Sequence, residues 1–361
     1  MEIIGSEYLP ANYKFELQKT IRQIERRKSK KIALQFPEGL MHLSTVISDI
    51  IRANTSVESV TILVDVVYGA CCIDDVSSYL IGCDLLIHYG HSCLFEVTKS
   101  LIQVMYIFVE ISFDISHCLK VVRKHVPTES LAVLGTIQYN STVRRIKKEL
   151  DAERVRRLAS SEAAGESEGA CVIPRRDPLS HGEVLGCTSP VVHADTVLFI
   201  SEGRFHLESL MIQNPNKAYY KYCPFSKRLT IEKHDYRKFI GIRRDVKKKA
   251  AETSAYLIVF GTLGRQGSMG ILHKIEEDLI KKGRTYYVVF ISEIDEVFVE
   301  ALQDITIIEI ACPRIAIDWG STFTVPIITP FEYFSRDLEN YPMDYYARES
   351  PQEMRPWQSL Q

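Results

Sequence analysis

The sequence predicts an α/β fold made of three related Rossmann-like domains with mainly parallel sheets. Short apolar runs rich in β-branched residues alternate along the chain with helical segments, and such alternation is typical of parallel sheets with right-handed crossovers. Three of these runs end in a polar or glycine-bearing loop and recur at a spacing of roughly a hundred residues, which is the size of a domain rather than of a solenoid repeat. The three runs are residues 30–40, 131–143 and 255–268.

Each of the three runs begins a further series of predicted strands. Their continuous apolar character is typical of strands covered by helices on both faces. The first run is followed by VTILVDV, DLLIHYG and MYIFVEI, the second by GACVIP, DTVLFIS and KAYYKY, and the third by TYYVVFI, ITIIEIA and FTVPIIT. Helical segments such as LHKIEEDLIKKG and IDEVFVEAL lie between them. The repeat predicts a first domain in residues 1–122, a second in 123–235, and a third in 236–361 that includes a C-terminal tail.

Composition and charge exclude several classes of protein. The 361 residues are 46% hydrophobic and 25% charged, with a formal net charge of −2, so the chain lacks the basic character of a general nucleic-acid-binding protein. No apolar run approaches the length of a bilayer span, and the first residues lack the basic-then-apolar pattern of a signal peptide. We therefore expect a cytoplasmic protein, in which the nine cysteines stay reduced.

Two segments have irregular composition. The part of residues 151–181 that is rich in Ala, Ser, Glu and Gly is expected to form a mobile surface loop. The aromatic residues of 333–361 show no regular pattern, so both wrapping over the body or a partner and partial disorder stay open.

Three cysteines are spaced at about the period of the predicted domains. Cys71, Cys187 and Cys312 each lie at or beyond the end of a predicted strand, and open α/β sheets bind ligands beyond the carboxyl ends of their strands. Three thiolates suit an iron–sulfur cluster or zinc, and three protein ligands leave one position open for chemistry. The spacing alone leaves coincidence open. The other cysteines near strands are interpreted as packing residues, and His88 and His91 as structural residues or ligands.

Several motifs in order resemble the diphthamide-synthesis family. They are YGACCIDD, HYGHSCL, LGCTSP, EGRFHLES, FGTLGRQGS and CPRIAIDWG, and the upstream LPANYKFE and ALQFPEGL resemble its eukaryotic subunit 1 branch. The resemblance extends from about residue 9 to about residue 319, and so many ordered motifs are far more specific than a single short pattern. One position departs from the family. The chain has YCPFSK where YDPYSK is usual, which places Cys223 at an expected aspartate and leaves that position's role in doubt.

The resemblance implies a function and its cofactors. Three homologous domains surround a central 4Fe–4S cluster, to which each domain gives one cysteine, here Cys71, Cys187 and Cys312. The cluster cleaves S-adenosylmethionine, although the C-x₃-C-x₂-C loop of conventional radical enzymes is absent. The resulting 3-amino-3-carboxypropyl radical is transferred to a histidine of elongation factor 2, in the first step of diphthamide biosynthesis. Expected partners are a related subunit 2 in a heterodimer, elongation factor 2, and a small iron-binding electron donor protein, with no membrane and no direct nucleic acid.

Candidate contacts to S-adenosylmethionine come from all three predicted domains. The guanidinium of Arg204 offers a planar fork for the carboxylate of S-adenosylmethionine, with an interdomain salt bridge as the alternative. His206 is either an orienting hydrogen-bond partner or a structural histidine. The glycine-bearing loop after the third run can cradle an anionic or ribosyl group with its N–H groups. The predicted contact residues are Arg204, His206, Gly261, Gly264, Arg265, Gln266 and Gln35.

Two other functions remain open at the level of the sequence. The chain could be a non-catalytic accessory subunit, in which the cluster stabilises the structure or transfers electrons. The presence of all three cysteines argues against this interpretation. It could also be a zinc protein with a Cys₃ site and a hydrolytic water, although no obvious general base accompanies the cysteines.

Overall fold

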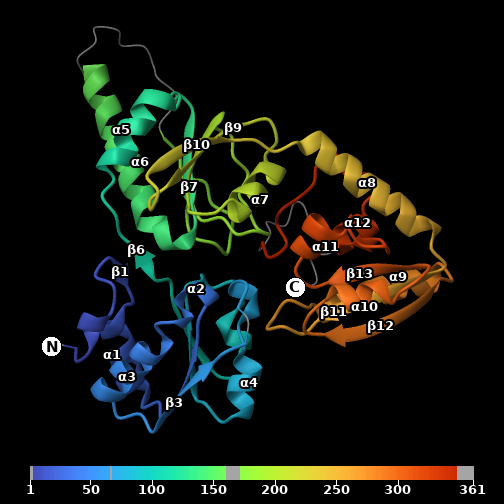
Figure 1. The fold of residues 1–361 in the computed structure, drawn as a ribbon, viewed down its shortest axis with the longest axis horizontal. Coiled ribbons are helices and arrows are strands. Elements are labelled where there is room, and N and C mark those ends of the chain that lie inside the picture. Colours follow the sequence, from blue (N-terminus) through green and yellow to red (C-terminus); the bar gives the residue numbers. More distant parts are fainter. Residues whose placement is uncertain (1–2, 66, 160–170, 348–361) are drawn as a thin grey trace. The chain divides into compact units, whose positions relative to one another are not determined.

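The computed structural model describes residues 3–65, 67–159 and 171–347 (Figure 1). Contacts divide the chain into two compact units. The first unit consists of Met1–Val184, Pro190–Leu207 and Asn216–Glu232, and the second of Leu185–Ser189, Glu208–Pro215 and Lys233–Gln361. Within the described ranges, we find no helix with the length and apolarity that crossing a membrane requires.

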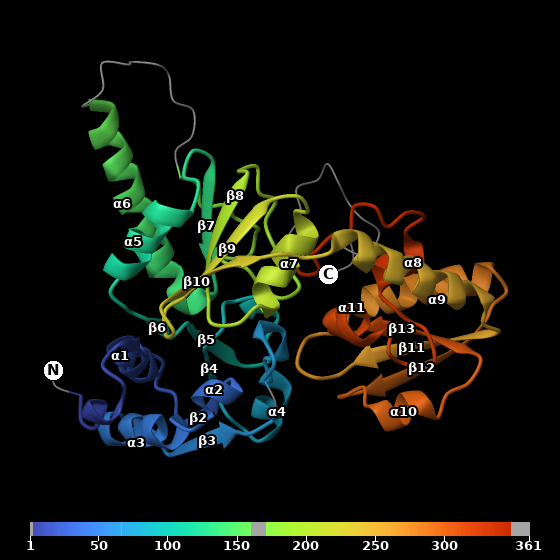
Figure 2. The ribbon, with the colours of Figure 1, turned by 45° about the horizontal axis from the view of Figure 1, so that its top comes forward.

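The first sheet is wholly parallel and lies in the first unit. Its strand order is β3–β2–β4–β5, formed by β2 (Lys31–Gln35), β3 (Ser59–Leu63), β4 (Leu85–Tyr89) and β5 (Gln103–Ile107). Successive strand residues point to opposite faces, so Ile32 and Leu34 pack under α1 (Leu17–Arg27) and α3 (Ser44–Asn54), while Ala33 packs on the other side. Helix α4 (Asp75–Leu80) lies on that other side (Figure 2). A short helix, α2 (Glu38–Met41), follows β2.

The second sheet, also in the first unit, ends in an antiparallel hairpin. Parallel strands β7 (Leu131–Gly135), β8 (Thr196–Ile200) and β9 (Ala218–Cys223) are followed by antiparallel β10 (Arg228–Glu232). Helices α5 (Ser116–His125) and α6 (Asn140–Ala159) bury their apolar sides against one face. A two-residue pairing joins β1 (Tyr13–Lys14) to β6 (Glu110–Ile111). Helix α7 (Phe205–Gln213) follows β8 and continues into the second unit.

The third sheet is the core of the second unit. Parallel strands β11 (Ala255–Gly261), β12 (Thr285–Ile291), β13 (Ile305–Ile310) and β14 (Ile327–Ile328) have the order β12–β11–β13–β14. One face is covered by α8 (Tyr236–Glu252), α9 (Met269–Lys281) and α12 (Pro330–Phe334). Buried residues of α10 (Glu296–Glu300) and α11 (Arg314–Trp319) pack on the other.

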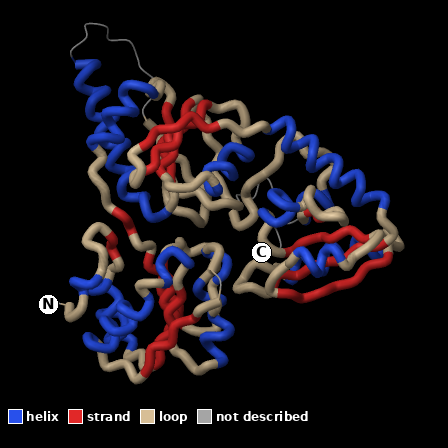
Figure 3. The backbone as a smooth tube through the Cα atoms, in the orientation of Figure 1, coloured by secondary structure: helices blue, strands red, loops and turns tan. Residues whose placement is uncertain are grey.

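The three sheets share one strand order, which explains the repeat in the sequence. In the first and third sheets, the first strand lies between the second and the third. In the second sheet, β7 pairs with β8 on one side and forms isolated parallel bridges from Ala132 to Val172 and from Gly135 to Glu183 on the other. Residues 172–183 thus occupy the place of the second strand. The α/β prediction with mainly parallel sheets is confirmed (Figure 3), whereas the three predicted domain boundaries stay a prediction.

One predicted strand differs from expectation, and the two segments of irregular composition are described only in part. The predicted strand GACVIP is reduced to a single bridge at Val172, and its first two residues lie outside the described ranges. Helix α6 continues to Ala159, and residues 160–170, which hold most of the Ala-, Ser-, Glu- and Gly-rich part predicted as a loop, lie outside the described ranges. In the predicted irregular tail, Leu338, Tyr341 and Met343 are buried against the third sheet, and residues 348–361 lie outside the described part.

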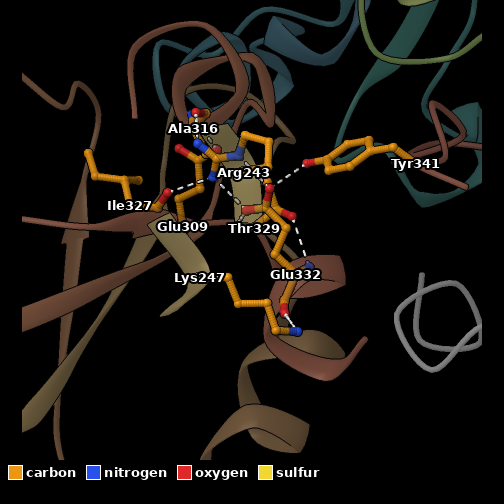
Figure 4. A network of polar contacts seen from close by, with 8 residues as sticks. All are labelled: Arg243, Lys247, Glu309, Ala316, Ile327, Thr329, Glu332 and Tyr341. Atoms are coloured by element: carbon orange, nitrogen blue, oxygen red, sulfur yellow. Dashed lines mark hydrogen bonds and ion pairs between the residues drawn. The ribbon is translucent and has the colours of Figure 1, made fainter. Parts of the chain in front are cut away.

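A buried ion pair fixes the core of the second unit (Figure 4). Arg243 of α8 donates from Nε and Nη2 to the two carboxylate oxygens of Glu332, each at 2.6 Å, and both side chains are fully buried. Its remaining donors reach the carbonyl oxygens of Ala316 and Ile327 at 2.7 and 2.8 Å. Tyr341 also donates to Glu332 at 3.0 Å. Every charge is therefore paired, as burial requires.

Candidate functional site

Cys71 lies in a short turn at the carboxyl edge of the first sheet. The 3-10 turn Ala70–Cys72 follows β3, and Cys71 is half-buried whereas Cys72 is buried. The N–H group of Cys72 donates to the carbonyl oxygen of Gly69 at 3.0 Å. The structure therefore places this predicted ligand where parallel sheets bind their ligands.

Gln35, at the end of β2, connects that turn to two histidines. Its side chain is 1% exposed. Its Nε2 donates to the Cys72 carbonyl oxygen at 2.8 Å, and its Oε1 accepts from the Asp74 N–H group at 3.2 Å. Nδ1 of His88 lies 2.8 Å from the same Oε1, and Nε2 of His88 lies 3.0 Å from Nδ1 of His91. Gln35 was predicted to contact S-adenosylmethionine, and the structure shows it holding the cysteine turn.

The two histidines are uncharged at neutral pH. Burial lowers the pKa of His88 well below its ordinary value, and the neighbouring His91 lowers it further. Burial lowers the pKa of His91 to about 4, and the charge of His206 adds to this effect. His206, a predicted contact residue on α7, therefore lies near this pair, and its own ring packs edge-on against Phe205 at a centroid distance of 5.4 Å.

Cys187 and Cys312 lie together in the second unit, and Arg314 connects their segments. Cys312 follows β13, and Arg314 begins α11 two residues later. The Arg314 side chain is 5% exposed, and its Nη1 donates to the carbonyl oxygen of Gly186 at 3.1 Å. Its other donors bind Glu208 at 2.9 Å and Asp318 at 2.9 and 3.0 Å. One charged fork thus holds the Cys187 loop against the helix that begins beside Cys312.

Further contacts fix the Cys187 loop to residues 343–346 of the same unit. The N–H group of Ser189 donates to the Met343 carbonyl oxygen at 2.7 Å, and the N–H group of Tyr345 donates to the Cys187 carbonyl oxygen at 3.3 Å. Thr188 donates its hydroxyl to the Cys187 sulfur at 3.7 Å. The loop is therefore held on both sides while Cys187 itself stays half-buried.

The predicted glycine-bearing loop also lies beside Cys312. A Cβ atom on Gly261 would come within 2.7 Å of the Ala311 Cβ atom, so this close approach requires glycine. Gly264 has a φ of 59°, in the left-handed region that glycine favours. Arg265 and Gln266 are both half-buried.

A buried carboxyl group lies beneath this loop. Glu309 is 1% exposed, and together with Gln266 and Ser268 it lines a small cavity. Burial raises the pKa of Glu309 well above its ordinary value, and its Oε1 accepts from the Ala316 N–H group at 3.0 Å. Burial of this carboxyl group therefore favours its neutral form.

Arg204 has a protein partner in this structure. Its Nη1 donates to Glu232 at 2.7 Å, and the Arg204 side chain is 41% exposed. Lys221 lies 3.5 Å from the same carboxylate. Arg204 and Glu232 both lie in the predicted second domain, so this ion pair is not the interdomain salt bridge that the sequence left open, and a side chain this exposed can exchange partners.

Cys223, at the position where the family resemblance led us to expect aspartate, has surroundings that favour an anion. It ends β9 and is half-buried. Burial raises the pKa of its thiol, but hydrogen bonds from the side chain and N–H group of Ser226 and from the N–H group of Phe225 outweigh this and leave the pKa below its ordinary value. These donors would serve a carboxylate equally well.

All nine cysteines are free of disulfides. Within the described ranges, no three His, Cys, Asp or Glu side chains are gathered closely enough to hold a metal ion. Cys71 belongs to the first unit, whereas Cys187 and Cys312 belong to the second. The structure thus places the segments of two predicted ligands in one unit, linked through Arg314, and leaves the assignment of all three a prediction.

The sequence analysis missed two buried residues, one in each unit. Arg314 stands in the CPR motif, but nothing in the sequence shows that it is buried or that it reaches Gly186. Glu183 is fully buried; it accepts hydrogen bonds from the Ser92 hydroxyl and, at 3.0 Å, from the Ser180 N–H group. Burial raises its pKa. A charged residue within a predicted ligand motif is the one signal that could have found Arg314.

Comparison with known proteins identifies relatives along nearly the whole chain. A family model for diphthamide synthesis proteins matches residues 36–339. The chain is 43% identical over 350 residues to the 2-(3-amino-3-carboxypropyl)histidine synthase subunit 1 of Encephalitozoon cuniculi, covering 96% of this chain and 95% of the relative. The subunit 1 of Dictyostelium discoideum is 40% identical over 363 residues, covering 96% of this chain and 74% of the relative.

Solved structures show the same fold. The crystal structure of Dph2 from Pyrococcus horikoshii matches with a TM-score of 0.73 and 23% identity, covering 98% of this chain and 97% of that chain. The structure of the same protein with a 4Fe–4S cluster matches with a TM-score of 0.74 and 24% identity, covering 93% and 96%. Since the family model matches most of the chain and its relatives share about 40% of their residues, this chain belongs to the diphthamide synthesis protein family.

Proposed function

We propose that the chain transfers the 3-amino-3-carboxypropyl group of S-adenosylmethionine to a histidine of elongation factor 2, the first step of diphthamide biosynthesis. Cys71, Cys187 and Cys312 would hold a 4Fe–4S cluster, and the chain would be a non-conventional radical transferase. The observation that carries the proposal is the hydrogen bond from Arg314 to Gly186 at 3.1 Å, because it holds the segments of two predicted ligands together in one unit.

The donor set fits such a cluster. The three cysteines are half-buried and form no disulfides, so each residue is partly exposed and keeps its thiol. Thiolates are the ordinary ligands of iron–sulfur clusters, and three of them leave one iron open. The name that the relatives share, histidine synthase subunit 1, and the 4Fe–4S cluster bound by Pyrococcus horikoshii Dph2 support the same assignment.

The chain's own residues would position the ligands and the cosubstrate. When bound, the cluster supplies the electron that cleaves the bond between the sulfur and the γ-carbon of S-adenosylmethionine. Gln35 and Arg314 hold the cysteine segments, and the loop of Gly261, with its N–H groups, would contact the cosubstrate. In the net reaction the sulfonium becomes a thioether, an imidazole C–H bond is replaced by a C–C bond, and one proton is released.

The proposed function includes partners and a location. The relatives' name, subunit 1, supports a heterodimer with a related subunit 2, and the protein substrate would be elongation factor 2. A small iron-binding protein would supply electrons. We place the chain in the cytoplasm, where free thiols stay reduced.

The decisive experiment is a product assay on anaerobically reconstituted protein with its subunit 2 relative, a reductant and S-adenosylmethionine. Chromatography would separate methylthioadenosine from 5′-deoxyadenosine. With S-adenosylmethionine labelled at its carboxyl carbon, the label found on elongation factor 2 would report transfer of the 3-amino-3-carboxypropyl group. We expect methylthioadenosine and label transfer from wild type and neither from Cys187→Ala. Cys83→Ala is the matched control, because Cys83 lies before the amino end of β4, away from the ligand edge, and should leave both products unchanged.

The other outcomes separate the alternatives. A 5′-deoxyadenosine product would indicate conventional radical chemistry on this fold. An intact brown cluster with no cleavage would support the accessory-subunit function. Colourless protein that contains zinc after anaerobic purification would support the zinc-site alternative.

A further inference from the structure

The hydrogen bonds of Gln35 fix the orientation of its amide. One neighbour, the Cys72 carbonyl oxygen, can only accept, and another, the Asp74 N–H group, can only donate. The amide nitrogen must therefore face Cys72 and the amide oxygen Asp74. Backbone groups thus settle an orientation that would otherwise be ambiguous.

This orientation determines the proton positions on both histidines. Because Gln35 Oε1 can only accept, His88 must carry its proton on Nδ1, 2.8 Å away. Neutral His88 then has a bare Nε2, which can only accept, so the proton between the rings belongs to Nδ1 of His91 at 3.0 Å. Neutral His91 is left with a bare Nε2. Among the described residues this atom has no hydrogen-bond partner, and the ring is half-buried, so a ligand can reach it.

We propose that Nε2 of His91 accepts a hydrogen bond from the ammonium group of S-adenosylmethionine, with Gln35 and His88 as positioning residues that hold the required tautomer. The identity of the ligand rests on the proposed function, whereas the tautomer does not. An ammonium group needs an acceptor with a lone pair, which a protonated histidine cannot provide. His206 lies near His91. Arg204, two residues before His206, would exchange its exposed ion pair with Glu232 for the carboxylate that S-adenosylmethionine carries on the same carbon atom as its ammonium group.

The tautomer can be measured without any ligand. In protein labelled with ¹⁵N-histidine, two-bond ¹⁵N–¹H correlations distinguish a protonated ring nitrogen from a bare one, and the His91→Asn spectrum assigns the signal. We expect His91 protonated at Nδ1 and bare at Nε2 in metal-free protein. Protonation at Nε2 would overturn the proposal, whatever the enzyme does.

Binding of the cosubstrate tests the contact itself. Equilibrium dialysis of reconstituted protein without reductant would compare S-adenosylmethionine with an analogue in which hydrogen replaces the amino group. Asparagine can imitate Nδ1 but removes the acceptor at Nε2, whereas glutamine can place an oxygen there. We expect His91→Asn to weaken S-adenosylmethionine binding by about tenfold to a hundredfold. It should leave the analogue unaffected, and His91→Gln should restore much of the loss.

Several results would overturn the contact. One is that His91→Asn weakens binding of S-adenosylmethionine and of the analogue equally. Another is that His91→Asn and His91→Gln bind S-adenosylmethionine equally weakly. The third is that the wild-type protein binds S-adenosylmethionine and the analogue with equal affinity. His125→Asn, at an exposed histidine on α5, controls for general effects. If wild type fails to bind S-adenosylmethionine at all, the proposed function fails as well, and the tautomer measurement still stands by itself.

Discussion

The two units hold their cysteine segments by different chemistry. In the first unit a neutral amide, Gln35, binds the turn of Cys71 through Cys72 and connects it to uncharged histidines. In the second unit a guanidinium, that of Arg314, binds the loop of Cys187 and is neutralised by two carboxylates. We call Gln35 with His88 and His91 the neutral clamp, and Arg314 with Glu208 and Asp318 the charged clamp. The strength of the neutral clamp should depend on the histidine tautomers and on pH, and that of the charged clamp on ion pairing.

Not every buried arginine in the second unit belongs to the site. Arg243 is as deeply buried as Arg314, but all its partners lie in the core of the third sheet and its helices. We therefore expect Arg243 to contribute mainly to the stability of the second unit, and Arg314 mainly to the position of the predicted ligand Cys187.

We expect the largest change in the free energy of unfolding when Arg243 is replaced. Arg243→Met leaves the carboxylate of Glu332 buried without its partner, which typically costs about 3–5 kcal/mol of unfolding free energy. Urea unfolding would measure it. The control is Arg244→Met, because Arg244 is 50% exposed and its ion pairs should contribute less than about 1 kcal/mol. Similar losses in the two variants would show that the buried pair has no special role.

Replacing Arg314 should have a smaller effect on stability but a larger one on the site. Arg314→Lys keeps the charge and loses the fork, so we expect a loss of about 2 kcal/mol. Amide hydrogen exchange of residues 185–189 should become faster, and iron content after reconstitution should fall. Arg243→Lys is the matched control and should not accelerate exchange selectively in that loop. Unchanged exchange at 185–189 would show that Arg314 does not hold the loop.

The sheets could be predicted from the sequence because burial on both faces leaves continuous apolar runs. The strand expected at GACVIP could not, since a single bridge at Val172 depends on pairing with β7 rather than on local composition. The cysteines were found through motifs and strand ends. Arg314 and Gln35 act through distant backbone groups, at Gly186 and Cys72, and no local pattern encodes such contacts.

A third prediction tests the neutral clamp directly. Gln35→Leu leaves the Cys72 carbonyl oxygen and the Asp74 N–H group without their partner, at a cost of about 1–3 kcal/mol. The loosened turn should expose Cys71, so alkylation of Cys71 followed by mass spectrometry should become faster. Gln266→Leu changes a glutamine in the second unit and should leave Cys71 unaffected. Equal alkylation rates in wild type and Gln35→Leu would remove Gln35 from the clamp.

The smallest expected effect is the change in the free energy of unfolding that lower pH causes through His91. An unfolded histidine titrates near 6.5, whereas His91 in the folded protein has a pKa of about 4. The unfolded state therefore takes up the proton first, and stability falls as pH decreases from about 6.5 towards 4. Between pH 7.5 and 5.5 this costs about 1 kcal/mol, and His88 contributes in the same direction.

Comparison of the two units isolates this effect. In the second unit, burial raises the pKa of Asp318 beside Arg314, so its contribution to stability is lost as pH rises rather than as pH falls. Acid should therefore lower the protection factors for hydrogen exchange, which correct for the intrinsic exchange rate at each pH, in residues 31–107 before residues 305–320. Urea unfolding of His91→Asn should show a pH dependence shallower than wild type by about 1 kcal/mol. Parallel pH profiles of wild type and variant would mean that His91 is not held neutral, and the neutral clamp would lose its physical basis.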